Sequence, residues 1–204
     1  MIGIAGIALV MALSNNVSEP IRPAFSGIDS RTIVSSANTT DYCTRYIHNG
    51  LDSDDLANKM LVTKDDMRIL VDHYAKRHPS SVFIGCEGAF IDASNLTGLD
   101  PLFLFSLAGV ESGWGTSEIH IKQGNPYSLG MYGDGKHNGY TVGDTFYDGI
   151  IDGACYIYEH YYLNGQTTLE TMNHMGDHSY CAGDPSWEAQ IKAEIKYCHK
   201  LLGK

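Results

Sequence analysis

The sequence predicts a mainly helical α+β domain that carries one small irregular or β element. Beyond residue 62, apolar residues recur at the i, i+3, i+4, i+7 spacing of a helix in several segments. Asp-Pro pairs, which favour a helix start, open two of these segments, at 100–101 and 184–185. A stretch dense in glycine and tyrosine, 124–148, interrupts the helical pattern and accounts for the irregular element. The length of 204 residues, 43% of them apolar, suits one globular domain plus an extension.

Residues 1–60 are expected to form an apolar N-terminal segment followed by an extended arm or linker. Residues 1–13 carry no charged side chain, and the rest of the arm is rich in Ser, Thr and Asn. A bilayer-spanning helix needs about 20 apolar residues, so the apolar run is short. The first basic side chain is Arg22, which is unusual for a secretory signal. Packing on the domain or a partner, association with a membrane, and an atypical signal all stay open for residues 1–13.

The main domain is expected to span residues 61–204 and to begin with two helices. TKDDM places Thr63 as the N-cap of the first, with an acidic first turn, and the His-Pro pair at 78–79 closes it. A second helix is expected over about 80–96. The third begins at Asp100, runs through LFLFSLAGVES and stops near Gly113.

Between 124 and 148 we expect a loop-rich segment with a possible short hairpin, because glycines and tyrosines alternate there. Helical pattern returns over about 148–162, with Asp148 as a cap and Asn164-Gly165 as the stop. The last helix starts at Asp184-Pro185, and Trp187 begins its apolar face.

Composition excludes some function classes. A net charge of −10 makes nucleic acid an unexpected partner, because binding to phosphates relies on Lys and Arg. None of the five cysteines forms a CxxC pair, so neither a zinc ribbon nor a thioredoxin-like site is supported, and the disulfide pattern stays open. His174 and His178 are spaced i, i+4, but without an HExxH motif they do not indicate a zinc site. We expect neither metal nor cofactor.

Glu111 is the residue that stands out chemically. It follows Leu104, Leu107 and Ala108 on the apolar stripe of the third helix, in the stretch GVESGWGTSE. Burial would raise the pKa of its carboxyl group and keep a proton available for general acid catalysis. The alternative is that Glu111 caps the helix or forms an ion pair at its end. Trp114, between two glycines, is expected either to stack on a sugar or to anchor the core.

The blocks GVESGWGTSEI and GNPYSLGMYGDG resemble the pattern of bacterial cell-wall endo-β-N-acetylglucosaminidases, the autolysin-type hydrolases of peptidoglycan. The likeness continues through GIIDGACYIYEHYYLNGQTTLETM and HSYCAGDPSWEAQI, in the family's order, over roughly residues 80–200. It implies a lysozyme-like fold and cleavage of the β-1,4 bond after N-acetylglucosamine. Peptidoglycan strands would then be the partner, and the location would be extracellular, at a cell wall or on a virion.

The resemblance also implies residue roles. Glu111 matches the catalytic glutamate and is expected to be the general acid. The second group stays open between Asp144, which we favour slightly, Asp134, and attack by the substrate's own acetamido group. For either aspartate a turn or cap role is the alternative. Tyr180 matches the family's late tyrosine. The remaining expected substrate contacts are Asn125, Tyr127, Ser128 and Tyr132, with packing as the alternative for the two tyrosines.

The sequence departs from the family at its turn, which reads Leu-Gly-Met-Tyr, and in a shortened loop from 133 to 147. These departures leave the second carboxylate and the bond that is cut open. A lytic transglycosylase or a muramidase acting on the same polymer is one alternative. A non-catalytic glycan-binding component of a phage tail or secretion apparatus is another. Membrane or virion contact through residues 1–13 is a further expectation.

Overall fold

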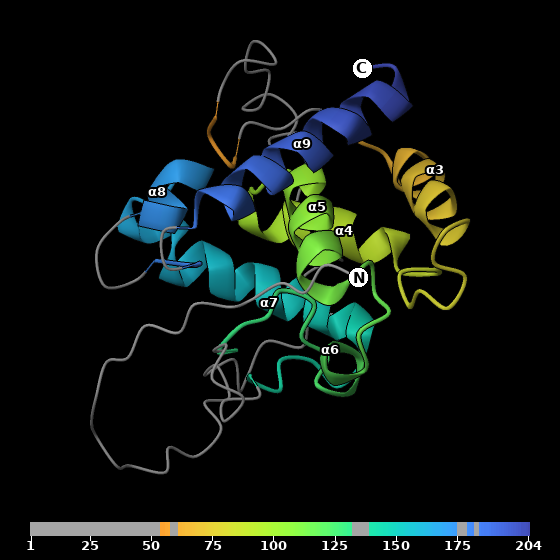
Figure 1. The fold of residues 1–204 in the computed structure, drawn as a ribbon, viewed down its shortest axis with the longest axis horizontal. Helices are drawn as coiled ribbons and strands as arrows, with labels where there is room; N and C mark the ends of the chain where they lie inside the picture. Colours follow the sequence, from red (N-terminus) through yellow and green to blue (C-terminus); the bar gives the residue numbers. More distant parts are fainter. Residues whose placement is uncertain (1–53, 58–60, 132–138, 175–178, 182–183) are drawn as a thin grey trace, which may run out of the picture.

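A computed structural model describes residues 54–57, 61–131, 139–174, 179–181 and 184–204 (Figure 1). The helices, in chain order, are α3 (Lys64–Ala75), α4 (Glu87–Thr97), α5 (Pro101–Ser112), α6 (Glu118–Lys122), α7 (Phe146–His160), the 3-10 turn η1 (Tyr162–Asn164), α8 (Leu169–His174) and α9 (Pro185–Leu202). The expected mainly helical architecture is therefore confirmed. The small β element is not found: the described residues contain no strand, and one isolated bridge joins Asp55 to Thr168.

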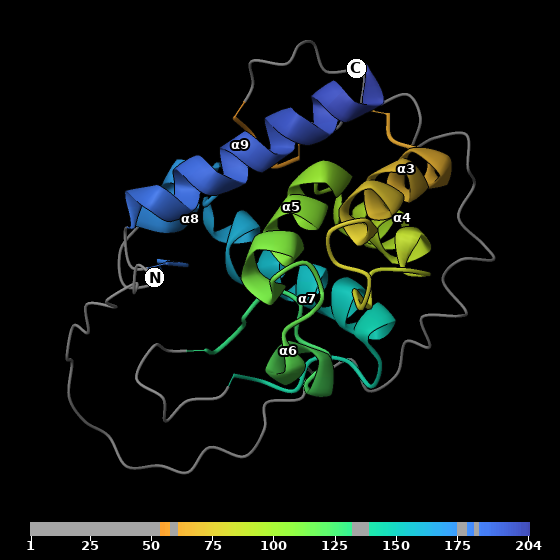
Figure 2. The same cartoon turned by 45° about the vertical axis from the view of Figure 1, so that its right-hand side comes forward.

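The helices enclose α5, which lies between α9 on one side and α7 on the other (Figures 1 and 2). Helix α5 contacts α9 and α4, and α4 contacts α7 and α3. Every residue of α5 from Pro101 to Gly109 is buried. A helix that is apolar on all faces belongs in the interior, and the run LFLFSLA has that character. Glu111 lies in the C-terminal turn of this buried helix.

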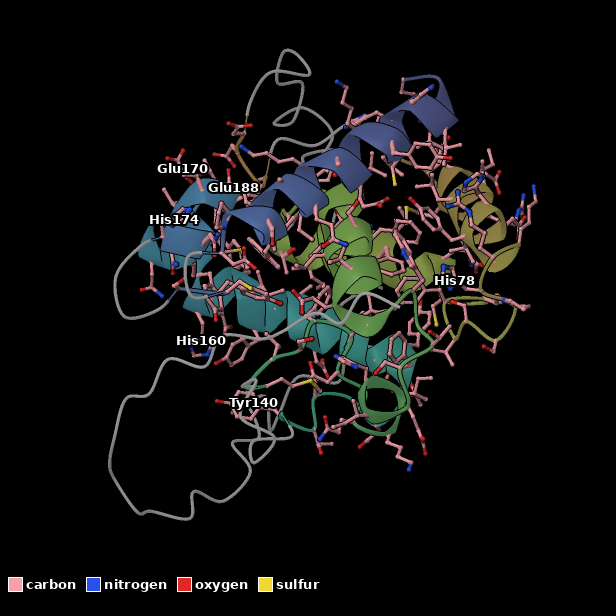
Figure 3. All side chains as sticks on the ribbon, viewed as in Figure 1. His78, Tyr140, His160, Glu170, His174 and Glu188 are labelled. Carbon is pink, nitrogen blue, oxygen red and sulfur yellow. The ribbon has the colours of Figure 1, made fainter. Side chains whose placement is uncertain are left out.

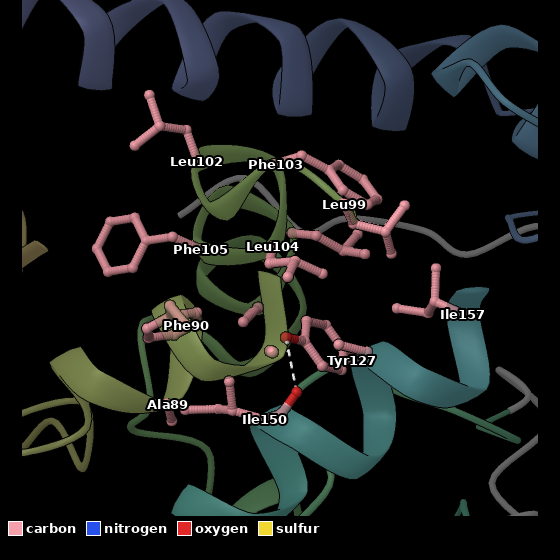
Figure 4. Packing of buried hydrophobic residues seen from close by; sticks show 14 of the residues in the cluster. Ala89, Phe90, Leu99, Leu102, Phe103, Leu104, Phe105, Tyr127, Ile150 and Ile157 are labelled. Carbon is pink, nitrogen blue, oxygen red and sulfur yellow. Dashed lines mark hydrogen bonds between the residues drawn. The ribbon is translucent and has the colours of Figure 1, made fainter. Parts of the chain in front are cut away.

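Around α5 the core is built from large side chains of several elements (Figure 4). Phe90 of α4 packs edge-to-face on Phe105 of α5, with ring centroids 5.3 Å apart. Ile150 and Ile157 of α7 are fully buried in the same core. Tyr127 lies among them and its hydroxyl donates to the carbonyl of Ile150 at 3.2 Å, which ties the loop after α6 to α7.

Side-chain caps set the helix ends that the sequence predicted. Thr63 and Asp66 form a reciprocal capping box at α3, and the helix ends at Ala75, a few residues before the His-Pro pair. The carboxylate of Asp100 accepts from the backbone N–H of Leu102 at 2.6 Å at the start of α5. Asp184 caps α9 in the same way. These predicted starts are confirmed because each depends on partners two or three residues away.

Two predicted helix starts are wrong. The second helix begins at Glu87 rather than near 80, because residues 80–86 fold into turns. Gly85 there has a φ of +90°, which a right-handed helix does not accommodate. Helix α7 begins at Phe146, capped by Thr145, and Asp148 is not the cap but the third residue of the helix, where it accepts from the Thr145 hydroxyl at 2.7 Å.

The segment 124–148 contains no strand among its described residues, and 132–138 are outside the described part of the chain. The short helices α6 and α8 were not predicted. Residues 1–53, including the apolar run and Cys43, also lie outside the described part. Leu56 belongs to the core: its N–H donates to the carbonyl of Thr167 at 2.7 Å, and its carbonyl accepts from Asp100 at 2.7 Å.

Candidate active site

The candidate site is centred on Glu111, in the last turn of α5. Gly113 ends the helix in the left-handed conformation, with a φ of +60°, and its N–H donates to the carbonyl of Gly109. Glu111 as a residue keeps partial exposure, while its carboxyl group is desolvated by the surrounding side chains. The expected position on a buried stripe is therefore confirmed, and no cation is paired with the carboxylate among the described residues.

The carboxyl group is held by two neutral donors from distant parts of the chain. Trp187 in the first turn of α9 donates its indole N–H to Oε1 of Glu111 at 2.7 Å. The side chain of Ser128, in the loop after α6, lies close to the same carboxyl group and, as a potential donor, favours its ionised form. Neither donor carries a charge, so the site offers hydrogen bonds to the carboxylate without forcing it to ionise.

Burial dominates the electrostatics of this group. It raises the pKa of Glu111, and the hydrogen bonds from Ser128 and Trp187 lower it by less. Burial also raises the pKa of Tyr180 well above its ordinary value and that of Cys181 to about 11, and in both cases the negative charge of Glu111 adds to the effect. A carboxyl group with a raised pKa retains a proton toward neutral pH, which is the property that a general acid requires.

Tyr180 lies against the same cluster. Its ring is 5.2 Å from that of Trp187 and 5.3 Å from that of Tyr161, measured between centroids. Its hydroxyl donates to the carbonyl of Tyr127. Tyr180 thus joins the start of α9 to the loop that carries Ser128, and the negative charge of Glu111 acts on its hydroxyl group.

A cluster of polar side chains connects the start of α9 to α8 (Figure 3). Glu188 lies 3.6 Å from His174 of α8 and 3.0 Å from Lys192, and Lys192 also approaches Asp54 at 3.6 Å. Each of these partly exposed pairs contributes little by itself, on the order of 0–1 kcal/mol. Their common effect is to hold the turn in which Trp187 sits.

Asn125 and Tyr127, both expected as substrate contacts, lie in the interior, and Tyr127 follows the packing alternative. Both are fully buried. The amide of Asn125 accepts from the N–H of Leu129 at 2.9 Å and donates to the carbonyls of Leu129 and Tyr140. The Asn125 side chain therefore satisfies polar backbone groups of the loop. Together with the buried Tyr127 ring, it shapes the segment that carries Ser128.

Trp114 is a core anchor rather than a wall of the Glu111 site. Its ring stacks on Tyr74 of α3 with centroids 3.6 Å apart, and it covers Gly109 so closely that a Cβ there would overlap with the indole. Its remaining exposed edge faces a separate cavity of about 380 Å³. That cavity is lined by Tyr74, Arg77, His78, Trp114, Glu194 and Tyr197.

The second carboxylate is not brought to Glu111 by the described contacts. Asp144 is exposed in the bend before α7, and its charge acts on Asp152 of that helix. Asp134 and Tyr132 lie outside the described residues. Sequence reasoning missed Trp187 as a site residue, and it missed His120, whose Nε2 lies 2.8 Å from Oγ of Ser128. Trp187 looked like one more apolar residue on its helix, and nothing in the spacing around His120 marks it.

Comparison with known proteins supports this geometry at the level of the fold. No family model matches the chain, and no curated protein matches it. Among solved structures, a catalytic glutamate-to-alanine mutant of S. aureus autolysin E in complex with the disaccharide NAG-NAM aligns with a TM-score of 0.61 and 21% identity, over 77% of this chain and 75% of that one. The fold is similar to that of autolysin E.

A second structure of autolysin E, in complex with the muropeptide NAM-L-Ala-D-iGlu, aligns with a TM-score of 0.60 at 23% identity over 73% of this chain and 72% of that one. A third, of autolysin E alone, gives 0.60 at 22% identity, over 74% of each chain. The resemblance to autolysin-type hydrolases seen in the sequence is therefore confirmed for the fold. The mainly helical architecture shared with autolysin E is also consistent with the lysozyme-like fold that the resemblance implied.

Other kinds of site have little support in the described residues. No cluster of three or more His, Cys, Asp or Glu side chains is placed to bind a metal there. None of the described helices is long and apolar enough to cross a membrane. Cys86, Cys155, Cys181 and Cys198 are free thiols.

Proposed function

We propose that this protein is a peptidoglycan hydrolase that cleaves the β-1,4 glycosidic bond after N-acetylglucosamine, with Glu111 as the general acid. The observation that carries the proposal is the buried carboxyl group of Glu111, held by two neutral donors at the end of the central helix. The fold supports it, because the similar autolysin E has been captured with NAG-NAM and with a muropeptide, and one of its structures is a catalytic glutamate mutant.

In this mechanism protonated Glu111 gives its proton to the glycosidic oxygen as the bond to the leaving sugar breaks. Trp187 and Ser128 then stabilise the carboxylate that remains, because both lie ready as donors. Ser128 and Tyr180 are the predicted contacts that stay close to Glu111, and we assign them to the substrate cleft. Tyr132 remains a proposed contact.

Attack on the anomeric carbon needs a second group. Asp144 and Asp134 are the proposed bases or nucleophiles, and the acetamido oxygen of the substrate is the third choice. Asp144→Asn and Asp134→Asn variants separate these routes. If one aspartate is the base or nucleophile, its variant loses activity and added azide restores cleavage by taking its place. If the acetamido group attacks, both variants stay active.

The decisive experiment is mass spectrometry of purified peptidoglycan after digestion. New reducing N-acetylglucosamine ends support the proposed bond, whereas reducing muramic ends indicate a muramidase and anhydromuramic ends a lytic transglycosylase. Binding without any new ends indicates a glycan-binding component. The proposed location, extracellular and at a cell wall or virion, depends on this substrate.

The first prediction concerns Glu111→Gln. Loss of the proton donor should lower the initial rate of release of reducing ends by about 10²–10⁴-fold. Glu170→Gln is the matched control, because Glu170 is exposed on α8 and no described contact joins it to the site (Figure 3). Equal activity of Glu111→Gln and the parent protein would refute the assignment of the general acid.

A further inference from the structure

We propose that His120 is a positioning residue, which holds the hydroxyl of Ser128 as a hydrogen-bond donor toward the ionised carboxyl group of Glu111. This inference rests on the proposed function, because it assigns the relay to the proton donor of that reaction. The relay consists of Ser117, His120, Ser128 and Glu111.

The imidazole of His120 is buried and is bracketed by two serines. His120 is 8% exposed, its Nδ1 lies 2.6 Å from Oγ of Ser117, and its Nε2 lies 2.8 Å from Oγ of Ser128. Ser117 is the N-cap residue of α6, yet its side chain makes no capping bond to the helix backbone. A serine at this position usually caps the helix. Its hydroxyl is used to orient His120 instead.

Ser128 has a backbone conformation that needs support. Its φ is +54°, in the left-handed region that non-glycine residues rarely adopt. Such conformations persist where the surrounding contacts determine them, and they concentrate at functional sites. Here the buried amide of Asn125 holds the next residue, Leu129, at both N–H and carbonyl, and His120 holds the Ser128 hydroxyl.

Counting hydrogens sets the direction of the relay. A serine hydroxyl donates one hydrogen, and a neutral imidazole carries one N–H. When Ser128 donates to the Glu111 carboxylate it cannot also donate to His120. Nε2 of His120 must then be the donor to Ser128, and Nδ1 must accept from Ser117. This tautomer directs every hydrogen of the relay toward Glu111. The other tautomer takes the hydrogen of Ser128 away from it.

The groups around the relay favour this arrangement near neutral pH. Burial lowers the pKa of His120, so the imidazole is neutral there. On its own helix, Glu118 and Lys122 are exposed and pair with each other at 2.6 Å. Around Glu111 the titratable neighbours are Tyr180 and Cys181, both with raised pKa values and therefore neutral. The Ser128 bond lowers the pKa of Glu111, so its loss should raise that pKa.

The test follows the ionisation of Glu111 directly. The full-length protein is labelled with ¹³C at the glutamate carboxyl carbons, the Glu111 signal is assigned by its absence in Glu111→Gln, and its chemical shift is followed with pH. In His120→Leu and in Ser128→Gly the midpoint should rise by about one pH unit, a tenfold change in the acid dissociation constant. His120→Gln, whose amide N–H can replace Nε2, should return the midpoint to that of the parent.

The variants are chosen so that folding does not decide the result. Glycine adopts the φ of Ser128 without strain, so Ser128→Gly should keep the melting temperature of the parent while it removes the hydroxyl. His73→Leu is the control histidine, because His73 lies on α3 and pairs with Arg77 and Tyr197. On peptidoglycan, the alkaline limb of the rate profile should move upward with the NMR midpoint.

An unchanged midpoint in both His120→Leu and Ser128→Gly would overturn the relay, as would an equal shift in His73→Leu. Failure of the proposed function looks different. In that case the parent protein releases no new sugar ends, while the Glu111 midpoint still responds to His120 and Ser128.

Discussion

At the scale of single residues, the burial that suits Glu111 to its proposed role as general acid opposes stability. Burial raises the pKa of its carboxyl group, which means that the folded protein binds a proton more tightly than the unfolded chain does. No cation offsets this cost among the described side chains, and the donors Trp187 and Ser128 reduce it only partly. Glu111 is therefore costly to keep ionised, and that cost is the reason why its carboxyl group retains a proton toward neutral pH.

A second prediction follows from this opposition. The ordinary pKa is 4.5 and the folded one is higher, so stability contributed by the protonated form is fully present below about pH 4.5 and is lost as pH rises through the folded pKa. Glu111→Gln does not titrate. Its melting temperature should equal that of the parent at about pH 4 and exceed it at about pH 8, where a gain of about 1 kcal/mol raises Tm by about 2–4 °C. Calorimetry over this range checks it, and a difference that shrinks with rising pH would contradict it.

At the scale of elements, the loop that carries Ser128 packs directly on α7, at positions where α7 has glycine. A Cβ at Gly149 would overlap with the carbonyl oxygen of Gly124, and one at Gly153 would meet the ring of Tyr127. The absence of side chains lets the loop backbone lie directly on the helix. This close approach explains why α7 carries glycines in its interior although they lower helix propensity by about 1 kcal/mol each.

The third prediction concerns Gly149→Ala. The added methyl group should push the loop away from α7 and lower the free energy of unfolding by about 1–3 kcal/mol, despite the better helix propensity of alanine. Urea denaturation measures the change. Glu159→Ala, an exposed change on the same helix, should stay within about 0.5 kcal/mol of the parent. A stabilised Gly149→Ala protein would show that the loop is not seated on the helix.

At the scale of the whole molecule, α5 organises the fold because it is buried from Pro101 to Gly109 and packs on both α4 and α9. The core also takes in a segment that precedes the first described helix. Leu56 is 4% exposed and bonds through its backbone to Thr167 and Asp100, whereas Leu61 is 85% exposed. Leu56 therefore belongs to the interior of the molecule, and Leu61 to its surface.

The fourth prediction compares these two leucines. Leu56→Ala should lower the free energy of unfolding by about 2–5 kcal/mol, because a buried side chain is replaced by a cavity. Leu61→Ala should change it by no more than about 0.5 kcal/mol. Thermal unfolding of both variants checks the prediction. Equal losses would mean that residues 54–57 do not belong to the core.

The sequence by itself determined the features that depend on neighbours a few residues apart. Thr63, Asp100 and Asp184 mark helix starts because a capping bond reaches only two or three residues along the chain. The apolar character of the helix ending at Glu111 was likewise visible, as was the order of motifs that resembles the autolysin-type family. The start at Glu87 was missed because the turns before it depend on contacts from outside the segment, such as the bond from the N–H of Val82 to Gly115.

Only the tertiary structure decided which side chains meet at Glu111. Trp187 and Ser128 are far from it in sequence, and no periodicity relates a residue on α9 or in the loop after α6 to the end of α5. The tertiary structure also decided which polar side chains are buried. Asn125 and Tyr127 have the chemistry of substrate contacts, yet both are buried and shape the loop. The sequence could single out Glu111 because a helical pattern depends on neighbouring residues, whereas the side chains around Glu111 depend on how the helices pack.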